Sequence, residues 1–133
     1  MVTLKHAVKI SAPRGAVYQA LTDLEAMRGW HLGTVEGAIL AGQVMTLTPK
    51  PGQRFSWRTD RLEPDAAIIQ TEVEGPGSSV GKTLTFTLSD LQDGSTQVDL
   101  THGEWLEGDD HLPFCNTHWG EALHRLKSHV EKT

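Results

Sequence analysis

The chain ends in one long amphipathic helix that is preceded by short strand-like segments. From Cys115 to Val130, apolar residues recur at helical spacing and form one stripe, while charged residues occupy the opposite side. The segments before this helix alternate with a period of two and are separated by turns rich in Gly and Pro. A single sheet of that length cannot bury its apolar face on itself, so it needs the closing helix laid across it. The pattern predicts an α+β fold in which a curved antiparallel sheet wraps around the C-terminal helix.

The expected elements follow from local periodicity and turn signals. A first strand over residues 3–10 has Leu4, His6, Val8 and Ile10 on one face. Pro13 then stands in the first turn of a helix, where its missing N–H costs little, and a second short helix follows. We expect six or seven strands in all, with the later ones at 35–40, 43–48, 55–60, 67–74, 83–88 and 96–105.

The composition excludes several classes of function. The chain has 133 residues with 12 Lys and Arg against 17 Asp and Glu, and it has no basic run, which argues against binding nucleic acid or an anionic membrane surface. No segment approaches the roughly 20 apolar residues that a membrane-spanning helix needs. One cysteine excludes an intrachain disulfide and fits a reducing compartment. We therefore expect a single domain over residues 1–133, in the cytoplasm and without membrane insertion.

His102 is the candidate for chemistry inside the fold. It lies on the last strand on the same face as Val98 and Leu100, and these apolar residues identify that face as inward. Because the unperturbed pKa of imidazole is near neutrality, an inward His102 is suited to a ligand hydrogen bond or, as a catalytic residue, to proton transfer. The alternative is a buried neutral histidine bonded to a backbone carbonyl or a neighbouring side chain.

Three side chains near the start of the closing helix have the chemistry of zinc ligands. His111, Cys115 and His118 stand at i, i+4 and i+7 and share one helix face. However, three ligands on one helix rarely converge on a tetrahedral ion, and no paired CxxC or HExxH motif supports the site. A Cys–His nucleophile would also need a third group that orients the base, and the sequence supplies none. We expect no metal and no other cofactor.

Tryptophan is frequent for a chain of this size. Trp30, Trp57, Trp105 and Trp119 supply the aromatic walls that a pocket for an apolar ligand needs, although aromatic side chains also dominate ordinary cores. For Trp57 and Trp119 both interpretations hold, since a pocket wall is also core. Trp105 lies near the end of its strand and is expected at the surface.

Short motifs along nearly the whole chain match a known group of proteins. They are Ile10–Pro13, Val17–Asp23, Trp30, Pro51–Phe55, Leu84–Leu88, Val98–Gly103 and Trp119–Gly120. With these motifs in this order, the chain resembles the START-like or SRPBCC superfamily of helix-grip proteins. Within it, the chain is most similar to the bacterial branch related to activators of the ninety-kDa heat-shock chaperone. The resemblance specifies fold far better than activity, because one scaffold hosts many functions in this group.

The resemblance implies a deep, largely apolar cavity between the sheet and the long helix. By position, the side chains expected to line it and to bind the ligand are Trp30, Phe55, Trp57, Phe86, His102, Cys115, His118 and Trp119. The chain has no recognisable iron or flavin motif, so the resemblance implies no cofactor.

The sequence leaves three functions open. The first is a binding protein, monomeric or homodimeric, with an internal cavity for a hydrophobic or amphipathic small molecule such as a lipid or polyketide-like compound. The second is an enzyme of the cyclase, dehydrase or hydrolase type with His102 as acid or base. The third is a protein-interaction or chaperone-associated module, which would present an exposed apolar patch instead of a cavity.

Overall fold

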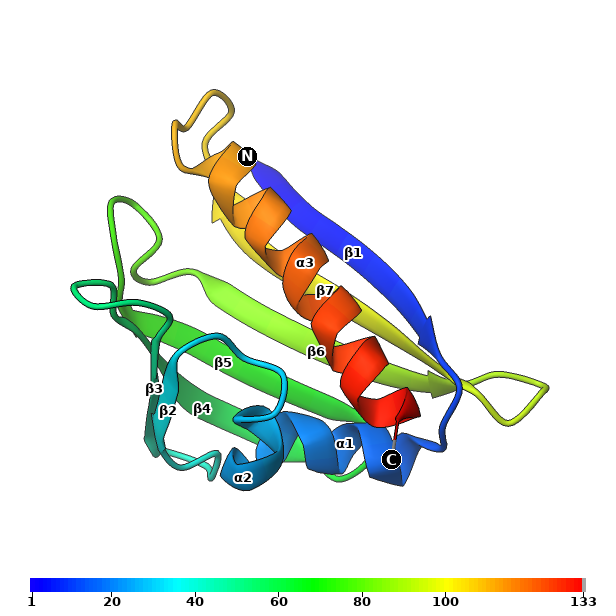
Figure 1. Cartoon of the computed structure of the whole chain (residues 1–133). Helices are drawn as coiled ribbons and strands as arrows, with labels where there is room; N and C mark the ends of the chain where they lie inside the picture. Colours follow the sequence, from blue (N-terminus) through cyan, green and yellow to red (C-terminus); the bar gives the residue numbers. More distant parts are fainter. Residues whose placement is uncertain (133) are drawn as a thin grey trace.

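The computed structural model describes residues 1–132, in which seven strands form one antiparallel sheet that wraps around a long helix (Figure 1). This confirms the α+β helix-grip fold predicted from the sequence. The elements in chain order are β1 (Val2–Ile10), α1 (Arg14–Thr22), α2 (Leu24–Met27), β2 (Thr34–Gly37), β3 (Val44–Thr48), β4 (Phe55–Glu63), β5 (Ala67–Glu74), β6 (Thr83–Asp90), β7 (Thr96–Trp105) and α3 (Leu112–Glu131).

The sheet is a meander completed by the first strand. Strands β2 to β7 pair in sequence order, and β1 returns to pair with β7, so the spatial order is β1-β7-β6-β5-β4-β3-β2. Figure 1 shows α3 running lengthwise over β7 and β6, with α1 and α2 lying across one end of the sheet. Strand β2 is shorter than expected because Gly37 has a positive φ of 96°, and a Cβ there would lie 2.2 Å from the carbonyl oxygen of Val44.

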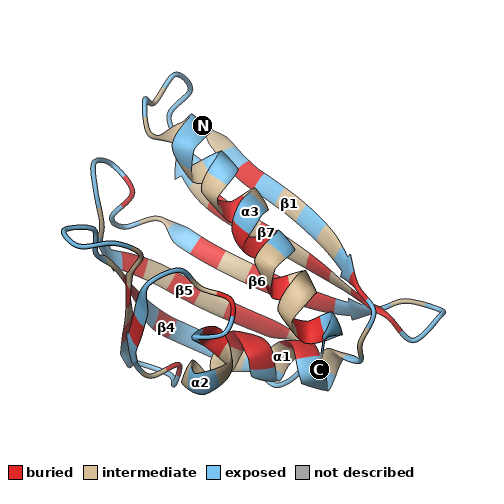
Figure 2. Ribbon diagram, viewed as in Figure 1, coloured by how far each residue is buried: buried red, intermediate tan, exposed pale blue. Residues whose placement is uncertain are grey.

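Helix α3 packs its apolar stripe onto the inner face of the sheet. Its buried side chains are Trp119, Ala122, Leu123, Leu126 and Val130, as the helical periodicity predicted. Figure 2 shows buried positions alternating with half-buried or exposed ones along the strands and along α3. The helix begins at Leu112, three residues before the predicted start, with Pro113 in its first turn. The backbone N–H of His111, just before the helix, donates to Asp109 Oδ1.

The segment after α2 is fixed to both α1 and α3. The indole Nε1 of Trp30 donates a 2.9 Å hydrogen bond to the carbonyl oxygen of Ala20 in α1. The guanidinium Nε of Arg125 in α3 donates to the carbonyl oxygen of Trp30 at 3.0 Å. These two bonds hold Trp30 between α1 and α3, where its side chain is buried.

One expectation about an individual residue is wrong. Trp105 is fully buried, with 0% of its surface exposed, because it pairs with Val2 of β1 and the Lys82 ammonium lies 4.5 Å from its ring centroid. In β4, the adjacent residues Ser56 and Trp57 are both buried. A register shift between Ser56 and Trp57 breaks the alternation of β4, so two consecutive residues are covered.

No helix in the described part of the chain is both long and apolar enough to cross a bilayer.

Candidate ligand-binding groove

A groove of about 450 Å³ opens at one end of the grip. Its walls come from the first two turns of α3, the connection between β3 and β4, and the loop after β5. The lining side chains are mostly aromatic or aliphatic, with a few polar groups among them: Leu32, Leu47, Pro49, Lys50, Gln53, Phe55, Trp57, Pro76, His111, Phe114, Cys115, His118 and Trp119. A concave, mainly apolar surface of this volume with a small number of polar groups is typical of small-molecule sites.

Two apolar side chains at the mouth of the groove are exposed. Phe114 has 75% of its surface accessible and Leu32 has 53%. Deeper in, the Phe55 and His118 rings stack with their centroids 6.1 Å apart, and Trp119 packs edge-on against His118 at 4.9 Å. The groove therefore has an accessible apolar entrance and a rigid aromatic wall.

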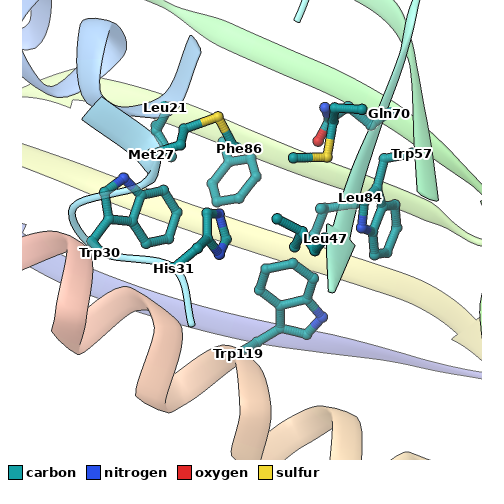
Figure 3. A pocket seen from close by; sticks show the side chains of 11 residues that line it. Leu21, Met27, Trp30, His31, Leu47, Trp57, Gln70, Leu84, Phe86 and Trp119 are labelled. Carbon is teal, nitrogen blue, oxygen red and sulfur yellow. The ribbon is translucent and has the colours of Figure 1, made fainter. Parts of the chain in front are cut away.

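Within residues 1–132, side chains occupy the space between sheet and helix where a deep cavity was expected. What remains is a void of about 20 Å³, room for roughly one water molecule. Figure 3 shows the side chains that converge on it from the sheet, α3 and the N-terminal helices, among them Trp30, His31 and Phe86. Leu47, Trp57 and Trp119 line both spaces, so these three side chains separate the groove from the void.

The predicted ligand-binding residues are divided among three places. Phe55, Trp57, Cys115, His118 and Trp119 line the groove. Trp30 and Phe86 line the small void, which Trp57 and Trp119 also border. His102 lines neither space and has 1% of its surface exposed.

His102 lies behind the groove wall in a cluster of aromatic rings. Its ring centroid is 5.6 Å from that of Trp57, 5.4 Å from Trp105 and 5.9 Å from Trp119. Its Nε2 is 3.9 Å from Oε1 of Glu72, beyond hydrogen-bond distance. The other oxygen of Glu72 accepts a 2.5 Å hydrogen bond from the Ser79 hydroxyl.

Burial shifts the pKa values of Glu72 and His102 in the directions that favour their neutral forms. It raises the pKa of Glu72 to about 7, although the hydrogen bond from Ser79 and the charge of Lys82 oppose the rise. Burial, together with the charges of Lys82 and His118, lowers the pKa of His102 to about 4. Near neutral pH, therefore, His102 is uncharged and Glu72 is close to half-protonated.

The start of α3 does not carry a reactive thiol. Burial and then the charge of Glu72 raise the pKa of Cys115 to about 11, so the nucleophilic thiolate is scarce at neutral pH. Among residues 1–132, no three His, Cys, Asp or Glu side chains lie close enough together to hold one metal ion, so His111, Cys115 and His118 form no such group.

Sequence reasoning missed Glu72, Leu32 and Phe114. The signal for Glu72 was present, since it follows Ile68 and Gln70 at a spacing of two and all three are buried. Leu32 and Phe114 lie outside the periodic apolar stripes, and no pattern within the chain distinguishes an exposed apolar residue at a groove from one elsewhere.

Comparison with known proteins gives a consistent family assignment. The model of the family described as "Activator of Hsp90 ATPase homolog 1-like protein" matches residues 11–131. Among curated proteins, no sequence matches the chain. The family match and the similar structures confirm the SRPBCC-type bacterial branch that the sequence motifs indicated.

Several solved structures share this fold over nearly the whole chain. The solution structure of the Aha1 dimer from Colwellia psychrerythraea is 27% identical, with a TM-score of 0.89, and the match covers 98% of this chain and 97% of that one. Protein MLL2253 from Mesorhizobium loti is 17% identical, with a TM-score of 0.85 and coverage of 99% and 98%. CalU16 from Micromonospora echinospora is 21% identical, with a TM-score of 0.79 and coverage of 96% and 75%.

Proposed function

Because the chain belongs to the family of proteins like activator of Hsp90 ATPase homolog 1, and because its grip ends in an apolar groove, we propose that it binds a hydrophobic or amphipathic small molecule. The observation that carries the proposal is the groove of about 450 Å³ lined by Phe55, Trp57 and Trp119, with Phe114 exposed at its mouth. Lys50, Gln53 and His111 stand among the apolar lining and suit a ligand with a polar portion.

The exposure of Phe114 and Leu32 supports this proposal. Exposing these apolar side chains to water costs about 25 cal/mol of free energy per Å² of apolar surface, and a bound apolar ligand would remove this exposure. A ligand that fills the groove would cover them and also contact the edges of the Phe55 and His118 rings, which already pack together. The groove is open in the structure, so its apolar lining is accessible to a ligand.

The test uses N-phenyl-1-naphthylamine, a neutral probe whose fluorescence rises in apolar surroundings. We expect saturable binding to the wild-type protein and about 10-fold weaker binding to Phe114→Ser, since losing much of a buried phenyl contact costs roughly 1.4 kcal/mol or more. Leu32→Ser should weaken binding in the same direction. The matched control is Leu106→Ser, which changes an apolar residue with 65% exposure that does not line the groove.

Two results would count against a small-molecule site in the groove. One is equal loss of probe binding in Leu106→Ser and Phe114→Ser, which would indicate non-specific adsorption. The other is no saturable binding to the folded wild-type protein, which would favour the protein-interaction function, with Phe114 and Leu32 as part of an interface.

For the assembly, monomer and homodimer both remain predictions. The similar protein from Colwellia psychrerythraea is described as a dimer. In the present chain, the free edge of the sheet at β1 carries the exposed residues Lys5 and Lys9, and edge lysines oppose strand pairing between copies. We propose that a dimer of this chain uses a surface other than the β1 edge. Sedimentation velocity of the wild type beside Lys5→Val tests this proposal.

A further inference from the structure

Several buried polar atoms gather directly behind the groove without hydrogen-bond partners. Within residues 1–132, the atoms concerned are Nδ1 and Nε2 of His102, Nε1 of Trp57 and Nε1 of Trp105. The three side chains are 1%, 3% and 0% exposed, so solvent at the surface does not satisfy them. Each buried polar group left unsatisfied costs about 1–3 kcal/mol, and proteins rarely retain several of them in one place.

These atoms belong to one cluster with the Glu72 carboxyl group. The rings of Trp57 and Trp105 both pack edge-on against His102, at centroid distances of 5.6 and 5.4 Å. Oε1 of Glu72 is 3.9 Å from His102 Nε2, whereas Oε2 is bonded to Ser79. The cluster therefore offers two indole N–H donors, an imidazole that both donates and accepts, and one carboxyl oxygen.

The charge of the cluster favours a neutral guest. Neutral His102 and half-protonated Glu72 contribute little net charge near pH 7. The Lys82 ammonium, whose charge acts on both Glu72 and His102, lies over the Trp105 ring and donates a hydrogen bond to the carbonyl oxygen of Glu104. A matching ligand group would accept a hydrogen bond from the indole N–H donors and donate one to Oε1 of Glu72 or to a nitrogen of His102. A hydroxyl group does both.

One side chain connects the cluster to the groove. Trp57 belongs to the groove lining and to the cluster, and Cys115 of the lining responds to the charge of Glu72. On the loop side, a Cβ at Gly75 would clash with Oε2 of Glu72 and with Oγ of Ser79. Because Gly75 has no side chain, the carboxyl group of Glu72 lies directly against the loop that follows β5. The next residue of this loop, Pro76, lines the groove.

We propose that the cluster of Glu72, His102, Trp57 and Trp105 binds a hydroxyl group of the ligand whose apolar body occupies the groove. The inference rests on the proposed binding function and adds the chemical class of the ligand: an apolar, ring-sized body with an alcoholic or phenolic hydroxyl at its inner end. The aromatic wall binds the body without regard to its polar group, and the cluster distinguishes ligands that carry the hydroxyl from those that lack it.

The test compares naphthalene with 2-naphthol, which differ by one hydroxyl group, as competitors for N-phenyl-1-naphthylamine. We expect the wild-type protein to bind 2-naphthol at least about 10-fold more tightly than naphthalene, as one or two net hydrogen bonds would give. In His102→Leu, which removes both ring nitrogens, the ratio of the two Kd values should fall to about 2 or less. Trp105→Phe removes only one donor and should lower the ratio partly, which keeps the test valid if His102→Leu does not fold.

The matched control is Glu74→Gln, which changes an exposed carboxylate two residues along β5 and should leave the ratio unchanged. Equal affinity for the two competitors in the wild type, or a preference for 2-naphthol that survives in both His102→Leu and Trp105→Phe, would overturn the inference while leaving the groove as a binding site. Absence of any competition by either compound, in protein that also fails to bind the fluorescent probe, would overturn the proposed function itself.

Discussion

At the scale of single residues, Glu72 is the most unusual position in the fold. Its side chain has 2% of its surface exposed and depends on one hydroxyl, that of Ser79, for its hydrogen bond. Desolvation disfavours the carboxylate, so the protonated form persists to a pH well above the usual range of the group. Glu72 therefore makes the stability of the protein depend on pH near neutrality.

The folded protein retains a proton on Glu72 up to about pH 7, whereas the unfolded chain releases it near 4.5. Because the folded state binds more protons in this window, the contribution of Glu72 to stability falls as the pH rises from about 4.5 to about 7. Glu72→Gln removes this titration. We expect the free energy of unfolding of the variant, relative to wild type, to increase by about 3 kcal/mol between pH 4.5 and pH 8.

Urea denaturation at a series of pH values measures this difference, and the titration of His102 is common to both proteins. Glu74→Gln serves as the control at an exposed carboxylate. A difference between Glu72→Gln and wild type that stays constant with pH would show that Glu72 is ionised throughout and that its environment is more polar than the structure indicates.

His102 and Trp105 show which aspects of burial could be predicted from the sequence and which could not. The inward direction of His102 followed from its neighbours Val98 and Leu100, and the structure confirms it. The placement of Trp105 was wrong because a position near a strand end was taken as exposed, while a partner strand far away in sequence covers it. Burial at strand ends depends on contacts with segments that are distant in sequence. The alternation of residues within one strand does not predict these contacts.

At the scale of elements, α3 combines two roles along its length. Its first turns supply Phe114, Cys115, His118 and Trp119 to the groove, whereas the later turns bury Leu123, Leu126 and Val130 in the core. The sequence predicted this helix and its apolar stripe because helical periodicity is a local property. The bulge in β4 and the early end of β2 were not predicted, since they depend on pairing and on a close backbone approach.

This division predicts separable effects on stability and binding. Leu126→Ala should lower the free energy of unfolding by about 3 kcal/mol, because Leu126 is fully buried and truncation leaves a cavity. Below the unfolding transition, the Kd for N-phenyl-1-naphthylamine should remain within about 2-fold of wild type. Phe114→Ser should show the reverse pattern, with weakened binding and a small change in stability. Weakened binding in Leu126→Ala would mean that the two halves of the helix are coupled.

At the scale of the whole molecule, the sheet and α3 meet through packed side chains, and the groove proposed to bind a ligand lies at one end of the grip. The sequence predicted the residue types at the interface between the sheet and α3. It also predicted a cavity between these elements, deeper in the fold than the groove. Trp30, Trp57, Phe86 and Trp119 are large enough to occupy the interior, which leaves about 20 Å³. The volume left between elements depends on how all rotamers pack together, and this cannot be read from periodicity.

Ligand binding to a preformed groove should stabilise the whole fold by mass action. At a ligand concentration 100-fold above Kd, the gain is about 2.7 kcal/mol, which corresponds to a rise in Tm of about 8 °C for a domain of this size. Differential scanning calorimetry with 2-naphthol measures it, and Phe114→Ser at the same concentration should show a much smaller rise. A Tm that falls or stays constant in the wild type at saturation would argue that the compound binds the unfolded chain equally well.

The arrangement of aromatic rings around His102 has a spectroscopic consequence. Trp57 and Trp119 meet edge-to-face with centroids 5.8 Å apart, and Trp105 lies against the same imidazole. Indoles this close and this rigid couple their electronic transitions, so the near-ultraviolet circular dichroism should contain a strong signal from this cluster. Emission from these indoles should also change when the imidazole gains a proton, because imidazolium quenches indole more strongly than imidazole. The protein thus carries an optical reporter at the place where the ligand's polar end is proposed to lie, and no label is needed to observe it.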